Sequence, residues 1–360
     1  MELNLTQDLW HYLATADKPI LLYGMGNGAD KIIRVCEQKN IPIADCFASD
    51  GFVRGHSFHS KRVLSYSEAK ERYGSFIVLL SFATCLPDVL ENIKRVAAEN
   101  ELYAPDVPVF GDTLFDMEFY LAHKSEIEQT LALMADEESR STMENVIRYK
   151  ISGDITYLDA CESEEAPLFE ELLSASEIQS YVDLGAYNGD TIKKLLPYAP
   201  NLTEILALEP DERNFRKLWE YGDTLDESIY LTVLNYGAWS HEDELFFDAS
   251  GNRNANLSAT GGKKIKKVDV NSLDNILAGK SMDYIKYDVE GSEKEALEGS
   301  RKTIQAHAPK LLVSLYHRSE DIFSLPLMIH EMNPAYRLYV RKLRYIPAWD
   351  LNLYAIPTED

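Results

Sequence analysis

The sequence predicts an α/β protein made of two Rossmann-like domains joined by a helical connector. Three observations carry this prediction. Short apolar runs alternate with amphipathic helical patterns in residues 1–111 and again in residues 176–360, as in parallel sheets covered by helices. Residues 112–175 keep a helical period without a strong β run. The length of 360 residues suits two typical domains.

The first domain begins with a short apolar strand that ends at the glycine turn Gly24-Met-Gly-Asn-Gly28, and a helix follows. Further strands are expected at residues 43–48 and 76–81, and further helices at 67–73 and 87–99. Glycine suits any sharp strand-to-helix turn, so the turn alone does not establish a nucleotide site. Two roles therefore stay open: nucleotide binding with Asp50 near the ribose, or docking of a second copy to form a homo-oligomer.

The connector places apolar residues such as Phe115, Phe119 and Ile127 among charged ones, and an acidic run over residues 161–171 leads into the second domain. We expect its helices to cover one side of that domain, with the acidic run as a solvated face.

The second domain repeats the alternation of strands and helices, but it ends in two strands without a helix between them. Its expected helices are at residues 191–197, 212–221 and 294–306, and its expected parallel strands are at 181–184, 204–208, 230–235, 284–288 and 311–316. Residues 336–340 and 351–356 then read as an antiparallel hairpin. Five parallel strands followed by such a hairpin match the sheet expected of a class I methyltransferase fold.

The amino-acid composition limits which classes of binding partner are expected. With 36 basic and 59 acidic residues, the net charge is −23. Nucleic acids and anionic membranes need basic surfaces, so neither is expected as a partner, whereas a small-molecule or glycan acceptor is compatible with this charge. The four cysteines have no paired spacing, the start lacks signal-peptide features, and no apolar run is long enough to span a membrane, so a cytoplasmic protein is expected.

The turn after the first strand of the second domain is the candidate cofactor site. It has only two glycines, without the third of a dinucleotide fingerprint, and Asp190 stands where a pyrophosphate would meet the helix N-terminus. A carboxylate there repels phosphate and suits a cationic amino-acid end, which favours S-adenosylmethionine over NAD. The residues assigned to this turn are Asp183, Gly185, Ala186, Asn188, Gly189 and Asp190.

The next two strand ends complete the predicted cofactor site. Glu209, about 20 residues beyond Gly189, is placed to accept both ribose hydroxyls, although an acid after a strand is often a helix cap. Pro210 and Asn214 follow it, and the small residues Gly237 and Ala238 after the third strand are expected beside the adenine.

Acids gather at the end of the fourth strand, where ligands of open α/β sheets bind. Asp288, Glu290 and His317 are the candidate catalytic residues, since a carboxylate or an imidazole can act as general base on an acceptor hydroxyl. Glu293 is expected to be a first-turn helix acid. A site without a metal is favoured, and an oxygen-rich Mg²⁺ site formed by the three catalytic candidates is the alternative. Residues 248–262 are either a substrate lid or a surface loop.

Five blocks in order resemble the FkbM-type methyltransferase family over roughly residues 180–356. That resemblance implies an S-adenosylmethionine-dependent O-methyltransferase acting on hydroxyls of sugars, glycans or polyketide-like products. The blocks are Val182-Asp-Leu-Gly-Ala-Tyr-Asn-Gly-Asp190, Glu209-Pro-Asp-Glu-Arg-Asn-Phe215, Asn271-Ser-Leu-Asp274, Tyr284-Ile-Lys-Tyr-Asp-Val-Glu-Gly-Ser-Glu293 and Leu315-Tyr-His317.

Two other functions stay open. The chain could be a nucleotide-sugar binding or assembly protein whose second domain is catalytically idle, or a dehydrogenase that binds NAD at the turn from Gly24 to Ala29.

Overall fold

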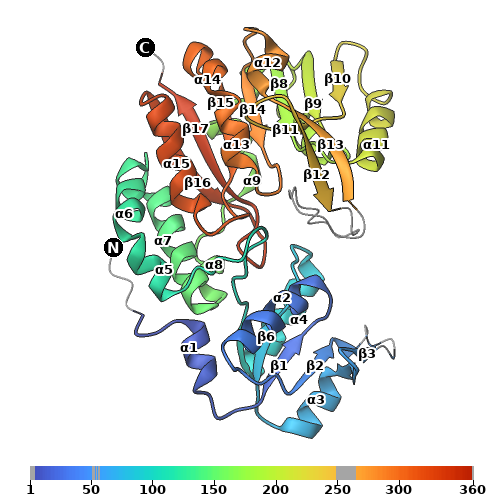
Figure 1. Cartoon of the computed structure of the whole chain (residues 1–360), viewed down its shortest axis with the longest axis vertical. Coiled ribbons are helices and arrows are strands. Elements are labelled where there is room, and N and C mark those ends of the chain that lie inside the picture. Colours follow the sequence, from blue (N-terminus) through green and yellow to red (C-terminus); the bar gives the residue numbers. More distant parts are fainter. Residues whose placement is uncertain (1–4, 51–52, 54, 56, 249–264, 359–360) are drawn as a thin grey trace.

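The computed structural model describes residues 5–50, 53, 55, 57–248 and 265–358. It confirms the predicted α/β fold class, with two sheets of different size (Figure 1). The first domain lies at the bottom of Figure 1, the second at the top, and the connector helices lie beside both on the left. Residues 248–262, expected to be either a substrate lid or a surface loop, fall almost entirely outside the described residues.

The first domain is a parallel sheet in the order β5-β2-β1-β6-β7, and a short hairpin, β3 and β4, lies outside it. Alternate residues of β1 face opposite sides: Ile20 and Leu22 pack with helices α1 and α2, whereas Leu21 and Tyr23 pack with α3 and α4. The elements are α1 Leu9–Ala14, β1 Ile20–Tyr23, α2 Asn27–Gln38, β2 Asp45–Ala48, β3 Ser57–Phe58, β4 Lys61–Arg62, β5 Leu64–Ser65, α3 Tyr66–Tyr73, β6 Ile77–Leu80, α4 Pro87–Glu99 and β7 Glu101–Tyr103.

The connector is helical and packs on the second sheet. Its longest helix, α7, lies against strand β16, and α6 lies against α15. Buried residues of α7, including Met143 and Val146, belong to one apolar cluster that continues from the first sheet into the second. The elements are α5 Met117–Ala122, α6 Lys124–Leu133, α7 Glu137–Ser152, α8 Thr156–Asp159, α9 Glu165–Pro167, the π-helix η2 Leu168–Leu172 and the 3₁₀ helix η3 Ala175–Glu177.

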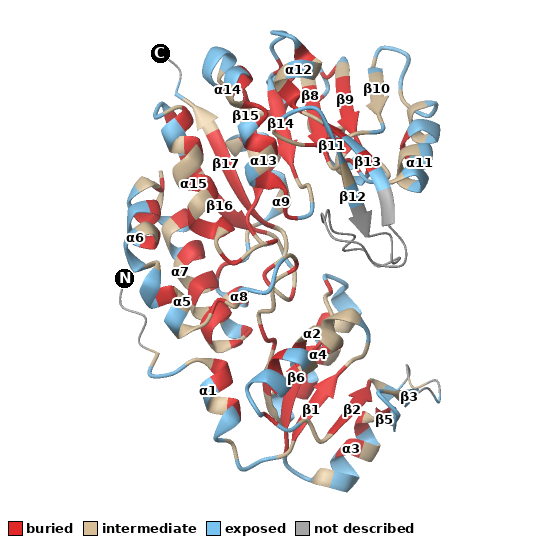
Figure 2. Ribbon diagram, viewed as in Figure 1, coloured by how far each residue is buried: buried red, intermediate tan, exposed pale blue. Residues whose placement is uncertain are grey.

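The second sheet has the order β10-β9-β8-β14-β15-β17-β16, in which only the β17 pairings are antiparallel. One face packs against η2, α10 and α11, and the other against α12, α13, α14 and α15. Figure 2 shows the buried central strands between these helices. The elements are β8 Ser180–Leu184, α10 Asp190–Leu195, β9 Glu204–Leu208, α11 Glu212–Gly222, β10 Tyr230–Leu234, α12 Leu273–Leu277, β14 Tyr284–Tyr287, α13 Glu293–Glu298, α14 Arg301–His307, β15 Lys310–Ser314, α15 Asp321–Met332, β16 Tyr336–Lys342 and β17 Leu351–Pro357.

Strands β3, β4, β5 and β7 of the first domain were not predicted from the sequence, and two features of the second domain also differ from the prediction. The single helix expected at residues 294–306 is two helices that break at Gly299, where an added Cβ would lie 2.0 Å from the carbonyl oxygen of Trp239. A third sheet, not predicted, pairs β11 Gly237–Ala238 and β12 Asp243–Asp248 with β13 Ile265–Asn271. Within the described ranges, no helix is both long and apolar enough to cross a membrane. None of the four cysteines, all described, forms a disulfide.

The segment that follows the first domain makes direct contacts with the second domain. The Phe110 amide donates to the carbonyl of His317 at 2.8 Å, and the Arg318 guanidinium lies 4.0 Å from the centre of the Phe110 ring. Thr84, after β6, and Ile346, between β16 and β17, exchange two backbone hydrogen bonds. Because these contacts fall at the carboxyl ends of strands in both sheets, the first domain is positioned next to the expected site of the second.

Asp136 joins the connector to the second sheet. Its carboxylate caps α7 through the Ser139 amide and pairs with Arg341 of β16 at 2.6 Å. Asp136→Ala removes both contacts and leaves a buried guanidinium without its closest partner, so we expect a loss of about 2 to 4 kcal/mol in the free energy of unfolding. Urea unfolding measures it. The control Asp211→Ala removes the side-chain cap of α11, and a loss no larger than in this control would contradict the role of the ion pair.

Candidate functional site

The glycine turn after β8 brings the backbone of this strand against that of β14. Gly185 has φ +86°, and an added Cβ would lie 1.9 Å from the carbonyl oxygen of Asp288. Gly189, at φ +82°, precedes α10, and its added Cβ would lie 2.6 Å from the Tyr221 ring. Both positions therefore need glycine for space as well as for backbone conformation.

Asp183 is buried and stabilises this turn through contacts with α10 and β14. Its side chain is fully buried, accepts a hydrogen bond from the Thr191 hydroxyl, and lies 3.0 Å from the ammonium of Lys286 on β14. Burial alone would lower the pKa of Lys286, but the Asp183 and Asp288 carboxylates raise it overall. Of the two acids that flank the turn, only Asp190 is exposed, so Asp190 is the one free to meet a ligand.

Glu209 connects the two βα turns. One carboxylate oxygen accepts from the Tyr187 amide and the other from the Asp211 amide, each at 2.8 Å. The side chain is 6% exposed, and burial raises its pKa to about 7. Each oxygen keeps a lone pair, so a carboxylate fixed in this way can still accept hydroxyl donors at the mouth of the turn.

The other predicted cofactor residues surround these two turns. The amides of Gly185 and Ala186 both donate to the carbonyl of Leu208, and Gly237 lies beside Pro210. Gly237 and Ala238 are buried in β11. Asn188 and Asn214 are both partly exposed, and Asn214 donates its amide to the capping carboxylate of Asp211.

The acidic loop after β14 surrounds His317. The imidazole Nε2 lies 3.6 Å from Asp288 Oδ1 and 3.5 Å from Glu290 Oε2, and Nδ1 lies 2.9 Å from Glu293 Oε1. Glu290 has φ +55°, an uncommon conformation for a residue other than glycine, and such strain gathers at functional sites. The structure thus brings together the three predicted catalytic residues and adds Glu293, which the sequence assigned to a helix terminus.

Electrostatics set the charge of this group. Although burial alone would lower the pKa of His317, Glu293 and the other two carboxylates raise it well above its ordinary value. Burial would raise the pKa of Asp288, but the Lys286 ammonium and His317 lower it overall. The surroundings thus favour the charged form of both His317 and Asp288.

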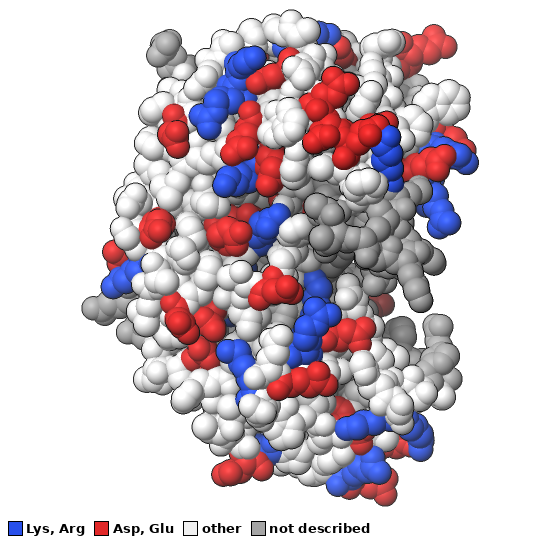
Figure 3. All heavy atoms as spheres, in the orientation of Figure 1, with Lys and Arg blue, Asp and Glu red and all other residues white. Residues whose placement is uncertain are grey.

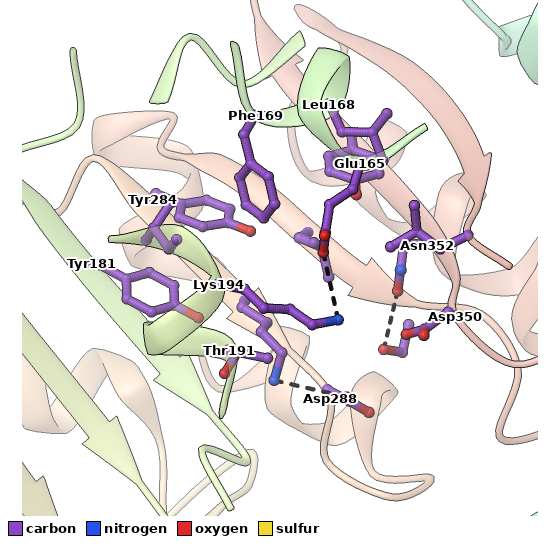
Figure 4. Close-up of a pocket in the computed structure, with 16 residues that line it drawn as sticks. Glu165, Leu168, Phe169, Tyr181, Thr191, Lys194, Tyr284, Asp288, Asp350 and Asn352 are labelled. Atoms are coloured by element: carbon purple, nitrogen blue, oxygen red, sulfur yellow. Dashed lines mark hydrogen bonds and ion pairs between the residues drawn. The ribbon is translucent and has the colours of Figure 1, made fainter. Parts of the chain in front are cut away.

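A small pocket of about 70 Å³ adjoins Asp288 on the side of α10 (Figure 4). Its polar wall includes Lys286, Asp350, Asn352 and the Glu165–Lys194 ion pair. Sequence reasoning missed these residues. For Lys286, the sequence did offer a signal, because a lysine inside the otherwise apolar strand 284–287 is unusual. Asp350 directly precedes β17 and Asn352 lies near its start, and only the pairing of β17 with β15 brings them to the pocket.

The glycine turn of the first domain has a packing explanation. An added Cβ at Gly24 would lie 2.5 Å from the Phe82 ring, and one at Gly28 would lie 2.4 Å from the Ser81 carbonyl oxygen. Asp50, the predicted ribose partner, accepts hydrogen bonds from Ser67 instead. These contacts account for Gly24 and Gly28, and a φ of +107° accounts for Gly26, without a nucleotide.

Comparison with known proteins identifies the second domain. Residues 183–347 match the methyltransferase FkbM domain. A crystal structure of methyltransferase FkbM from Methylobacillus flagellatus KT is 21% identical and aligns over 94% of this chain and 90% of that chain, with a TM-score of 0.71. No curated protein matches. The second domain therefore matches the FkbM methyltransferase domain over residues 183–347, and the fold of the chain, including the first domain, is similar to that of a solved structure.

More distant structures share only part of the chain. An rRNA methylase from Streptococcus thermophilus is 12% identical over 53% of this chain and 94% of that chain, with a TM-score of 0.35. A fibrillarin from Aeropyrum pernix, in complex with natively bound S-adenosyl-L-methionine, is 11% identical over 49% of this chain and 66% of that chain, with a TM-score of 0.31.

The contact of Gly185 with Asp288 gives a stability prediction. Gly185→Ala forces the β8 turn away from the acidic loop, and we expect it to lower the free energy of unfolding by at least about 2 kcal/mol more than Gly279→Ala does. Gly279 also has a positive φ, +92°, but an added Cβ there meets no atom within 4 Å, so this control isolates the backbone strain. Equal losses in denaturant unfolding would show that the close approach is unimportant.

Proposed function

We propose that this protein is an S-adenosylmethionine-dependent O-methyltransferase that acts on a hydroxyl of a sugar, glycan or related metabolite. The observation that carries the proposal is the pairing of two features on adjacent strands of an FkbM methyltransferase domain. The glycine turn and Glu209 suit a nucleoside with a cationic amino-acid end. The acidic loop beside them suits a polyhydroxylated acceptor.

In the proposed complex, Glu209 accepts hydrogen bonds from the ribose hydroxyls and Asp190 attracts the methionine ammonium. Gly185 lets the cofactor approach the backbone closely, and Gly237 and Ala238 leave room for the adenine. The fixed position of the Glu209 carboxylate, which two backbone amides hold, supports the ribose assignment.

Methyl transfer from a sulfonium requires the acceptor oxygen in line with the methyl carbon and the sulfur. The carbon–sulfur bond breaks as the carbon–oxygen bond forms, and the hydroxyl proton passes to the Asp288 carboxylate. Because Lys286 helps to keep the pKa of Asp288 low, Asp288 is a weak base. Alignment at near-attack distance therefore supplies most of the rate, and Glu290 holds a neighbouring hydroxyl.

The acidic surface supports a small-molecule or glycan acceptor in the cytoplasm, without nucleic acid or membrane as a partner. In Figure 3, acidic and basic side chains of the described residues are interspersed over both domains, and no extended basic surface is present on this face. Because packing and backbone conformation explain the glycines of the Gly24 turn, these glycines are no evidence for a nucleotide-sugar or NAD site. A role of the first domain in homo-oligomer formation is a further proposal.

Calorimetry with S-adenosylhomocysteine tests the cofactor assignment. We expect binding that weakens about tenfold between pH 8 and pH 6, because protonation of Glu209, whose pKa is about 7, removes the charged acceptor of the ribose hydroxyls. The variant Glu209→Gln should bind more weakly and lose this pH dependence. No binding by the wild-type protein at pH 8 would refute the proposed function, and mass spectrometry of the denatured protein would then reveal whether a nucleotide sugar is carried instead.

Asp288→Asn separates chemistry from cofactor binding. We expect turnover to fall about 10²-fold, since the amide cannot take the hydroxyl proton, while the affinity for S-adenosylhomocysteine stays within threefold. Glu298→Gln, at an exposed position of α13, is the control and should change neither quantity. Unchanged turnover of Asp288→Asn on an acceptor that the wild type methylates would remove Asp288 from the mechanism.

A further inference from the structure

We propose that Asp288, Glu290 and His317 bind one divalent cation of the Mg²⁺ and Mn²⁺ class, with Glu293 holding the imidazole from behind. Binding of the cation is a property of this chain alone. Only its task, which is to hold the acceptor hydroxyl, rests on the proposed function.

The first argument is the state of His317. Its side chain is fully buried, and Nε2 makes no hydrogen bond to any residue that the structure describes, whereas Nδ1 faces Glu293 Oε1 at 2.9 Å. Buried polar groups are nearly always satisfied. A buried Nε2 that faces two carboxylates without a hydrogen bond is therefore an arrangement that a further group should complete.

The second argument is distance. Nε2 lies 3.6 Å from Asp288 Oδ1 and 3.5 Å from Glu290 Oε2. A charge-assisted hydrogen bond would bring these atoms to about 2.7 to 2.9 Å. Two ligands that each lie about 2.0 to 2.2 Å from one cation can be up to about 4.4 Å apart, so both separations suit a shared ion. Glu293 also places a carboxylate oxygen within 4.8 Å of ligand atoms of Asp288 and His317, as expected of a group that supports the imidazole beside such an ion.

The third argument is the support behind the imidazole. Glu293 Oε1 lies 2.9 Å from Nδ1 and accepts the Val289 amide at 2.8 Å, and the Glu293 side chain is 1% exposed. Histidine ligands of metals usually have a carboxylate or carbonyl at their other nitrogen, which fixes the tautomer and the ring orientation. Asp288 is supported likewise, because the Tyr316 hydroxyl donates to its Oδ1 at 3.0 Å.

The fourth argument is charge. Three carboxylates face one imidazole, and the nearby side-chain cations have other partners. Lys286 lies closer to Asp183, at 3.0 Å, than to Asp288, at 3.8 Å. Arg318 donates to the Gly291 carbonyl and stacks on Phe110. A divalent ion would balance the remaining negative charge.

The position of the group suits a role in acceptor binding. The Asp288 and Glu290 side chains are 29% and 49% exposed, whereas His317 and Glu293 are buried, so the ion would be held from one side and open to solvent on the other. One imidazole with carboxylates and water favours Mg²⁺ or Mn²⁺ over softer-ligand metals. On the open side such an ion would bind an acceptor hydroxyl and lower its pKa, while Asp288 would bind the ion through Oδ1 and keep Oδ2, 3.8 Å from Lys286, to take the proton.

Electron paramagnetic resonance of Mn²⁺ titrated into the full chain, without cofactor, tests the site. We expect one Mn²⁺ per chain that Mg²⁺ displaces. His317→Gln and Asp288→Ala should each weaken binding more than tenfold, and Glu293→Gln about tenfold through loss of ring orientation. His11→Ala and Glu298→Gln, exposed positions outside the cluster, are the controls and should bind as the wild type does.

Two results would overturn the inference: no Mn²⁺ binding by the wild type at millimolar concentration, or binding that His317→Gln and Asp288→Ala both retain although circular dichroism shows them folded. If a variant unfolds, the wild-type titration with and without Mg²⁺ still decides. Calorimetry with S-adenosylhomocysteine in the presence of EDTA is independent of the ion. Cofactor binding without Mn²⁺ binding would therefore refute the cation site and leave the proposed function unaffected. Mn²⁺ binding without cofactor binding would refute the proposed function and leave the cation site unaffected.

Discussion

The close contact of β8 with β14 is the constraint on which the rest of the site depends. Gly185 lies against the Asp288 carbonyl, and the buried pair of Asp183 and Lys286 joins the same two strands. A buried ion pair is costly unless both charges are well matched, and here the Thr191 hydroxyl completes the set. The predicted cofactor turn and the acidic loop are thus held at one place by the same residues, so the position of one fixes the position of the other.

The first domain stabilises this site from the other side. The segment that leaves it places Phe110 against Gly291, where an added Cβ would lie 2.6 Å from the ring. It thereby packs on the turn that holds Glu290 in its strained conformation, and the backbone of His317 is bonded to the same segment. One apolar cluster runs from the first sheet through α7 into the second, which makes the two domains a continuous packed structure rather than two bodies on a linker.

Much of the fold was predictable because strands and helices here have clear local patterns. The five parallel strands and the terminal hairpin were placed within a few residues. The failed predictions concern non-local features: β7 and the third sheet depend on pairing with other strands, and Gly299, where the helix breaks, lies against the distant Trp239 carbonyl. In the site, the residues at strand ends came together as expected. Asp350 and Asn352 could not be placed, because their approach to the cavity follows from hairpin register.

By itself, the sequence determined the type of site: glycines where the backbone must turn, an acid at the end of each of two neighbouring strands, and an ordered set of blocks that resembles one methyltransferase family. These features depend only on neighbouring residues or on the order of motifs, so they can be recognised from the sequence alone. Only the tertiary structure decided how the charges are used. It buried Asp183 against Lys286 and left Asp190 exposed, and it surrounded His317 with three carboxylates. The pKa and ligand capacity of an ionisable group depend on burial and on neighbours distant in the chain, so spacing alone could not have given them.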